Sequence, residues 1–259
     1  MAIRPWLMCC NKEGTMAQKK VNAVIHSQEK LAEGIYSMWL DAPEMAEAAV
    51  PGQFIAVYTN DPSKLLPRPI SICEADKENG RLRIVYRIAG AGTKEFSAYE
   101  EGDTLDIMGP LGNGFPLKKK KAFLIGGGIG IPPMLELAKN LDCEKTAVIG
   151  YRDKETFLAD ELRKYADVVI ATEDGSVGTK GNVIDAIRAE KLTADIIYAC
   201  GPTPMLKALK TYAMENGIEC YISLEEKMAC GIGACLGCVC HSKDIDEHSN
   251  VRNKRICKD

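Results

Sequence analysis

The sequence predicts a six-stranded antiparallel β-barrel, then an α/β domain built on a parallel sheet, and last a small cysteine-rich domain. Three observations lead to this prediction. Runs of β-branched and aromatic residues recur at short intervals up to about residue 117, strand and helix patterns alternate after residue 121, and cysteines crowd into the end of the chain. At 259 residues the chain is long enough for two domains with their own cores and a shorter third one.

The predicted barrel occupies residues 17–118. Turn residues break this region into short runs of the kind that form strands in closed antiparallel sheets. The expected strands are residues 21–27, 34–40, 53–59, 68–74, 81–88 and 103–109. The stretch 93–99 follows two glycines and is the only helix expected in this half.

The predicted α/β domain occupies residues 119–223. Its expected strands cover residues 122–126, 146–152, 168–174, 195–201 and 220–224, and its expected helices follow residue 131 and cover 155–166, 181–192 and 204–217. Such alternation is typical of a parallel sheet with helices packed against it. The four lysines at 118–121 mark the boundary between the two domains, and we expect them to form a solvated linker.

Composition narrows the classes of function. Hydrophobic residues make up 46% of the chain and charged residues 27%, with a net charge of -3, which argues against nucleic acid or a membrane surface as the main partner. No stretch is long and apolar enough to span a bilayer, and residues 1–16 are expected to be a disordered leader rather than a signal peptide. Eleven cysteines without a secretory signal favour a reducing cytoplasm and a metal centre over disulfides.

The cysteine-rich domain is predicted over residues 224–259. Cys230, Cys235 and Cys238 have the spacing C-x4-C-x2-C, and Cys257 follows after eighteen residues. This is the plant-type ferredoxin arrangement, which holds a [2Fe-2S] cluster. The interspersed glycines allow the backbone to curl and direct N–H groups at the cluster sulfurs. They are Gly231, Gly233 and Gly237.

Zinc is the competing interpretation of these cysteines, and plain buried thiols are a third. Cys235 and Cys238 form a C-x2-C pair that could combine with Cys240, His241 or Cys257. The four-residue loop with its glycines suits zinc poorly, so we favour the cluster. Cys240 is expected to point away because it alternates with Cys238, which leaves Cys257 as the preferred fourth ligand.

Three motifs are expected at one edge of the parallel sheet. The loop that contains Gly128 and Gly130 has the form G-x-G-x-x-P between a strand and a helix, where a phosphate-binding turn belongs, although a simple tight turn is the alternative. The sequence A-C-G-P at 199–202 ends another strand. Glu173 and Asp174 lie at the end of a third strand, and we expect these carboxylates to hold a ribose.

The barrel half carries a second candidate anion site. Arg68 and Ser71 belong to the sequence R-P-I-S at the start of a strand, and Gly92 with Thr93 opens the expected helix. Free N–H groups at such a helix start bind anions. A phosphate shared between Arg68 and this helix is one interpretation, and an ordinary surface turn is the other.

Taken in order, R-P-I-S, G-x-G-x-x-P, C-G-P and C-x4-C-x2-C resemble the ferredoxin reductase superfamily. The stretch S-L-E-E-K-M-A-C-G-I-G-A-C closely resembles the electron-transfer subunits of class 1B dihydroorotate dehydrogenases, and the likeness covers residues 17–259. It implies an FAD-binding barrel, an NAD-binding α/β domain and a [2Fe-2S] domain. By similarity, the FAD-binding residues are Arg68, Pro69, Ile70, Ser71, Val85, Tyr86, Arg87, Gly92 and Thr93.

The same resemblance assigns the nucleotide edge. Gly128 and Gly130 would lie against the NAD pyrophosphate, with Gly201 and Pro202 beside them, and Cys200 would take the catalytic position near the nicotinamide and flavin rings. NADP-dependent relatives usually carry a basic residue where this chain has Glu173 and Asp174, so we expect NAD(H). Arg152, after the preceding strand, is the one residue that speaks against this preference.

The resemblance also implies a division of labour. The chain would carry electrons between NAD(H) and a partner flavoprotein, an FMN-containing (β/α)8 barrel that oxidises dihydroorotate to orotate in pyrimidine biosynthesis, with two copies of each subunit. The chain offers no positioned base for that oxidation, because its three histidines are expected on the surface. The alternatives are a small subunit of a ferredoxin:NADP oxidoreductase and, more remotely, a non-catalytic zinc or redox-sensing protein.

Overall fold

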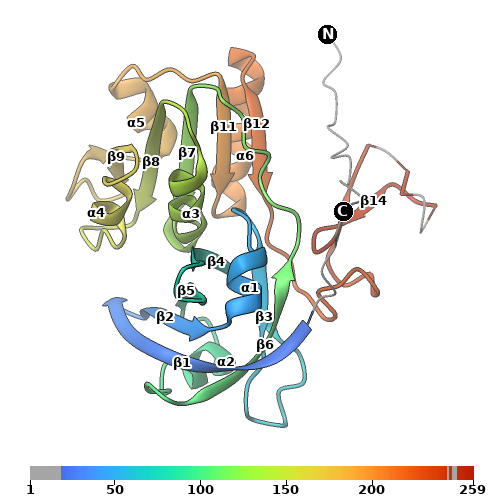
Figure 1. Cartoon of the computed structure of the whole chain (residues 1–259). Coiled ribbons are helices and arrows are strands. Elements are labelled where there is room, and N and C mark those ends of the chain that lie inside the picture. The colour runs from blue at the N-terminus through green and yellow to red at the C-terminus, as the bar shows by residue number, and fades with distance from the viewer. Residues whose placement is uncertain (1–18, 244, 247–249) are drawn as a thin grey trace.

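The computed structural model describes residues 19–243, 245–246 and 250–259; the leader predicted over residues 1–16 lies outside them. Six antiparallel strands close into a barrel in the order β1-β2-β5-β4-β3-β6 (Figure 1). Alternate side chains fill its interior, as the burial pattern of β6 shows. The strands are β1 (Lys19–Ala32), β2 (Ile35–Asp41), β3 (Phe54–Val57), β4 (Arg68–Asp76), β5 (Arg81–Arg87) and β6 (Thr104–Leu111).

The predicted barrel is therefore confirmed, but the prediction of a single helix in this half is wrong. Helix α1 (Pro43–Ala48) lies between β2 and β3 and buries Met45 and Ala46, and helix α2 (Ala91–Phe96) begins two residues before the predicted start. Pro43 occupies the first turn of α1, where a missing N–H costs nothing. With six residues, α1 is too short to produce a readable helical period.

The α/β domain contains a six-stranded parallel sheet in the order β10-β9-β8-β7-β11-β12. Helices α3 and α4 contribute to the core on one face of the sheet, and α5 and α6 to the core on the other. The strands are β7 (Ala122–Gly127), β8 (Lys145–Tyr151), β9 (Asp167–Thr172), β10 (Thr179–Lys180), β11 (Ile196–Cys200) and β12 (Glu219–Ser223). The helices are α3 (Pro132–Asn140), α4 (Ala159–Leu162), α5 (Val183–Ala189) and α6 (Thr203–Asn216), with a 3-10 turn at Gly128–Gly130.

Two details of this domain differ from the predictions. The two-residue strand β10 was not predicted, and the helix predicted over 155–166 is reduced to α4. Leu158 precedes α4 with a φ of 64°, a left-handed conformation that no helix passes through. The lysines at 118–121, expected to form a solvated linker, remain partly or largely exposed, and each also forms an ion pair: Lys118 and Lys120 with Glu219, Lys119 with Asp142, and Lys121 with Glu144.

The cysteine-rich segment packs beside the barrel although the whole α/β domain separates them in sequence (Figure 1). A Cβ atom placed on Gly231 would lie 3.1 Å from Cδ1 of Leu111 in β6. Asn113 donates a hydrogen bond to the carbonyl oxygen of Lys258, 145 residues away, at 3.1 Å. Within the segment, β13 (Val239–His241) pairs with β14 (Asn253–Arg255).

Candidate functional site

The structure brings Arg68 of β4 against the start of α2. A Cβ atom on Gly92 would lie only 2.1 Å from Nε of Arg68, so the guanidinium group packs directly on the glycine backbone. The same guanidinium donates from NH1 to the carbonyl oxygen of Leu66 at 2.6 Å. A cation therefore lies over a helix start, which is a suitable place for a phosphate.

Thr93 supports this corner from within. Its hydroxyl accepts hydrogen bonds from the backbone N–H groups of Ala89 and Gly90, at 2.8 and 3.2 Å, and donates one to the carbonyl oxygen of Gly90. The side chain thus fixes the turn that leads into α2. The family resemblance places Thr93 near the FAD phosphates, and in the structure its hydroxyl also holds this turn in place.

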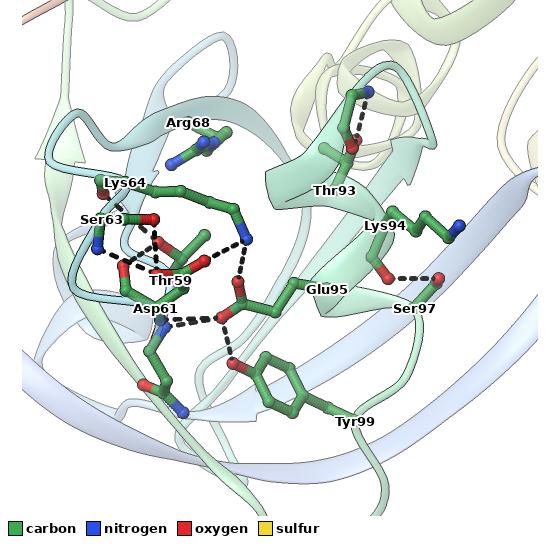
Figure 2. Close-up of polar contacts among 12 residues, drawn as sticks. Thr59, Asp61, Ser63, Lys64, Arg68, Thr93, Lys94, Glu95, Ser97 and Tyr99 are labelled. Carbon is green, nitrogen blue, oxygen red and sulfur yellow. Dashed lines mark hydrogen bonds and ion pairs between the residues drawn. The ribbon is translucent and has the colours of Figure 1, made fainter.

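Glu95 was not singled out from the sequence, yet it ties the loop between β3 and β4 to α2 (Figure 2). Its carboxylate accepts hydrogen bonds from the Asn60 backbone N–H at 2.7 Å, Lys64 Nζ at 2.8 Å and the Tyr99 hydroxyl at 2.7 Å. Burial acts to raise the pKa of Glu95, but these donors outweigh it and lower the pKa. The loop that precedes Arg68 is consequently anchored.

The other predicted FAD-binding residues lie on β4 and β5 with different exposures. Val85 and Tyr86 are buried, and Tyr86 donates its hydroxyl to Oε1 of Gln28 at 2.7 Å, so its side chain is used inside the barrel and only its backbone is available to a cofactor. Arg87 is exposed at the end of β5. On β4, Pro69 is exposed, Ile70 is buried and Ser71 is half-buried.

The glycine loop and the A-C-G-P segment interlock at one edge of the parallel sheet. Strands β7 and β11 are neighbours, with Gly126 opposite Cys200. A Cβ atom on Gly130 would lie 2.3 Å from the Cys200 carbonyl oxygen, and one on Gly201 would lie 2.6 Å from Cε of Met205. Strand order reverses between β7 and β11, which is where open α/β sheets bind nucleotides. Gly128, with a φ of +53°, has open space around it.

Cys200 is fully buried at this edge, and burial raises the pKa of its thiol to about 12. It is therefore a neutral thiol at pH 7 and not a nucleophile. Glu225, which follows β12, was not singled out from the sequence; it influences Cys200 electrostatically and also interacts with Arg87 of the barrel. Desolvation by the surrounding protein raises the pKa of the Glu225 carboxyl group, although the residue is partly exposed. The positive charge of Arg87 acts in the opposite direction. Residues from all three predicted domains therefore influence one another electrostatically at this edge.

The predicted ribose carboxylates lie further along the same edge. Strand β9 ends at Thr172, and β8 separates it from β7. Asp174 accepts hydrogen bonds from the backbone N–H and the hydroxyl of Ser176, at 2.9 and 2.7 Å, and these donors lower its pKa. Its backbone N–H donates to the carbonyl oxygen of Arg152. Asp174 thus shapes the turn, and Glu173 is exposed beside it.

The cysteines form two close pairs. The backbone N–H of Cys235 donates to Sγ of Cys230 at 3.3 Å, and the sulfurs of Cys238 and Cys257 lie 3.3 Å apart in a buried position. Cys257 also interacts electrostatically with Cys230, which links the two pairs. Cys240 lies on β13, where its thiol is influenced by Cys238 but belongs to neither pair.

These residues fit an iron-sulfur cluster. Burial acts to raise the pKa of Cys230, yet the backbone N–H groups of Cys235, Ile232 and Ala234 outweigh it and lower the pKa to about 7. Gly231 and Gly233, with φ values of +69° and +78°, allow this curl. Burial and the neighbouring thiol of Cys238 raise the pKa of Cys257 to about 12, a cost that a bound metal would offset.

Two pairs of thiols suit two irons with two thiolates each better than one tetrahedral ion. The arrangement therefore favours the [2Fe-2S] interpretation over zinc.

Comparison with known proteins gives the same domain types. Residues 22–115 match the family described as oxidoreductase FAD-binding domain, and residues 225–259 match the iron-sulfur cluster binding domain of dihydroorotate dehydrogenase B. The chain is 42% identical over 253 residues to the dihydroorotate dehydrogenase B (NAD(+)) electron transfer subunit of Geobacillus sp. (strain WCH70), covering 94% of this chain and 95% of the relative. The chain belongs to the dihydroorotate dehydrogenase B electron transfer subunit family.

Other members and neighbours agree. The electron transfer subunit of Streptococcus mutans serotype c (strain ATCC 700610 / UA159) is 44% identical over 249 residues, covering 93% of this chain and 94% of its own. An NADH-dependent reduced ferredoxin-NADP oxidoreductase structure aligns with a TM-score of 0.83 and 30% identity, covering 95% of this chain and 88% of its own. This family resemblance confirms FAD, NAD(H) and an iron-sulfur cluster as the cofactors. Within the described residues, no helix has the length and apolar character to cross a membrane.

Proposed function

We propose that this chain carries electrons between NAD(H) and a catalytic flavoprotein subunit that oxidises dihydroorotate to orotate, a step of pyrimidine biosynthesis. The partner is proposed to be an FMN-containing (β/α)8 barrel, with two copies of each subunit assembled in the cytoplasm. The names of the relatives at 42–44% identity support the pairing of an electron transfer subunit with a dehydrogenase.

One observation carries the proposal: the barrel lies between the two other parts. On one side, Glu225 interacts electrostatically with both Arg87 of the barrel and Cys200 at the nucleotide edge. On another, Leu111 of β6 contacts the cysteine segment at Gly231. When bound in the barrel, FAD supplies the chemistry that links a two-electron donor to a one-electron acceptor.

The central predicted residues have the following parts in this proposal. Arg68 holds a phosphate of FAD over the start of α2, and the backbone of Val85 and Tyr86 borders the flavin. Gly128 and Gly130 let the NAD pyrophosphate approach the backbone, while the neutral thiol of Cys200 packs near the nicotinamide. The cluster is held by the four paired cysteines, which are Cys230, Cys235, Cys238 and Cys257.

Anaerobic titration of the purified chain with NADH tests the proposal. NADH should bleach the flavin absorbance and produce the EPR signal of a reduced [2Fe-2S] cluster. NADH that reduces neither centre would overturn the pathway.

A ferredoxin:NADP oxidoreductase small subunit is the second candidate, favoured by the structural neighbour at 30% identity. The two candidates differ in partner and in nucleotide. Reduction by NADH together with a co-purifying FMN-containing dehydrogenase supports the first; preference for NADPH together with a co-purifying ferredoxin-reducing subunit supports the second.

A further inference from the structure

Arg255 is a buried cation at the centre of the cysteine segment. Its side chain is 8% exposed, and its guanidinium group uses both edges: Nε and NH2 donate to the two carboxylate oxygens of Asp259 at 2.8 and 2.9 Å, and NH1 donates to the Gly233 carbonyl oxygen at 3.0 Å. Asp246 lies further away, at 3.7 Å. One side chain therefore joins β14, the C-x4-C loop and the last turn of the described chain.

The Arg255–Asp259 pair closes a turn around Cys257. The backbone N–H of Arg255 donates to Asp259 Oδ2 at 2.7 Å, and the N–H groups of Lys258 and Asp259 donate to the Arg255 carbonyl oxygen at 3.0 and 2.8 Å. The N–H of Ile256 donates to the carbonyl oxygen of Cys238 at 3.1 Å. The position of the Cys257 sulfur beside that of Cys238 is consequently fixed from both sides.

The contact with Gly233 fixes the other pair of thiols. Gly233 lies in the loop whose N–H groups point at Cys230, and its φ of +78° leaves its carbonyl oxygen directed at Arg255. A planar guanidinium group with several donors in a rigid fork can hold this carbonyl and a carboxylate at once, which an ammonium group does poorly.

We propose that Arg255, clamped by Asp259, is the positioning residue of the iron-sulfur centre: it holds both halves of the ligand set in place and, as a charge beside the thiolates, raises the reduction potential of the cluster. This inference rests on the proposed function, because it takes Cys257 as a ligand. Arg255 also interacts electrostatically with Cys257. A nearby cation favours the added electron, and a nearby carboxylate opposes it.

The test uses the full-length, cofactor-loaded protein in four variants. Arg255→Lys keeps the charge and loses the fork, Arg255→Met loses both, Asp259→Asn removes the opposing charge, and Arg252→Met is a matched control that removes an exposed cation three residues away. Three quantities are measured: iron and sulfide per chain, the rate at which EDTA bleaches the cluster absorbance, and the cluster midpoint potential from an EPR-monitored titration.

We expect EDTA to bleach Arg255→Lys and Arg255→Met about tenfold faster than the parent, in line with the loss of groups that orient metal ligands. The potential should fall in Arg255→Met, rise in Asp259→Asn and stay close to the parent in Arg255→Lys. Opposite signs in the first two cannot come from loosened packing, which would move both in one direction. If Arg255→Met does not take up the cluster, Arg255→Lys and Asp259→Asn still test the proposal. An unchanged FAD content would show that the barrel is folded in each variant.

Parent-like bleaching and potential in the Arg255 variants would overturn the inference, as would shifts of the same sign in Arg255→Met and Asp259→Asn. Cys257→Ser separates this failure from that of the ligand set. If Cys257→Ser retains its iron, the proposed ligand is wrong; if it loses iron while the Arg255 variants behave like the parent, only the role of Arg255 is wrong.

Discussion

Arg83 of the barrel and Glu161 of the α/β domain form a two-pronged ion pair across the domain boundary, with NH1–Oε2 and NH2–Oε1 distances of 2.5 and 3.1 Å. Arg83 is 5% exposed and also contacts Glu74, which in turn binds Lys139 of α3 at 2.7 Å. Hydride transfer requires the two nucleotides to meet with their rings aligned, so this connection bears directly on function.

Replacing Arg83 with Met should lower the melting temperature of the cofactor-loaded protein by about 5–10 °C. The reason is that Glu161 and Glu74 would lose their shared cation, which we expect to cost about 2–3 kcal/mol because both carboxylates keep some contact with solvent. Arg81→Met is the matched control. Arg81 lies on the same strand as Arg83 and forms a partly exposed pair with Asp41 of β2, and losing this pair should cost under about 1 kcal/mol. Equal melting temperatures for the two variants would contradict a special role for Arg83.

Gly130→Ala should abolish or strongly weaken reduction by NADH while FAD remains bound. The added methyl group would collide with the Cys200 carbonyl group and the Gly201 nitrogen, and both partners are backbone atoms that cannot rotate away. Stopped-flow flavin bleaching and the FAD content measure the two effects. Gly102→Ala controls for backbone strain alone, because Gly102 has a φ of +89° but open space around it; a loss of the same size in Gly102→Ala would refute the steric argument.

Cys257→Ser should lose most of the cluster iron, whereas Cys240→Ser should retain it. Cys257 lies with its sulfur beside that of Cys238, and Cys240 is outside both thiol pairs. Iron and acid-labile sulfide, measured after anaerobic purification, decide between them. Iron loss confined to the Cys240 variant would show that the ligand assignment is wrong.

Glu219→Gln should destabilise the protein at neutral pH and have less effect in acid. Burial acts to raise the pKa of Glu219, but hydrogen bonds from Lys118, Tyr221 and Lys120 outweigh it and lower the pKa to about 2. The stabilisation is complete above the unfolded-state pKa near 4.5 and disappears as pH falls toward 2, amounting to at most about 3 kcal/mol. Melting temperatures from pH 7 to pH 3 should converge for parent and variant. Glu144→Gln, in the exposed pair with Lys121, is the control with little effect at any pH.

Glu173→Gln should raise kcat/KM for NADPH relative to NADH by about tenfold or more. Removing an exposed carboxylate relieves its repulsion of a 2′-phosphate, and Arg152 on the neighbouring loop can then contribute attraction. Asp174→Asn is expected to act less cleanly, because Asp174 also shapes its turn through Ser176. An unchanged nucleotide preference in Glu173→Gln would place the discriminating residue elsewhere.

Local sequence patterns were enough to predict the barrel, the parallel sheet and the cysteine-rich metal-binding domain. Each depends on a pattern within a short stretch of chain: residue alternation, alternating strands and helices, or the spacing of ligands. Short elements were missed: α1 with six residues and β10 with two are shorter than any reliable period. The late start of α4 after Leu158 could not be predicted either, because leucine rarely adopts the left-handed conformation found there.

Contacts between distant segments were predicted only where a recognisable motif marked both partners. Glu95, Glu225 and Arg255 are ordinary charged residues in sequence, and their importance depends on partners supplied by other elements or by the final fold. The lysines at 118–121 illustrate the same limit, because their carboxylate partners come from three separate positions of the chain, of which Glu219 serves two lysines. Arg68 and Gly92 were linked from the sequence only as a hypothesis, and the direct packing between them required the structure.

The hydrogen bond from Asn113 to Lys258 spans 145 residues of sequence. During synthesis the barrel leaves the ribosome early, and domains generally fold in that order. The side of the barrel that packs against the cysteine segment therefore stays exposed to solvent until the whole α/β domain has been synthesised. Because the cluster cysteines follow both other domains in the chain, we expect newly made chains starved of iron to accumulate as flavin-containing protein with a folded barrel and an exposed flank.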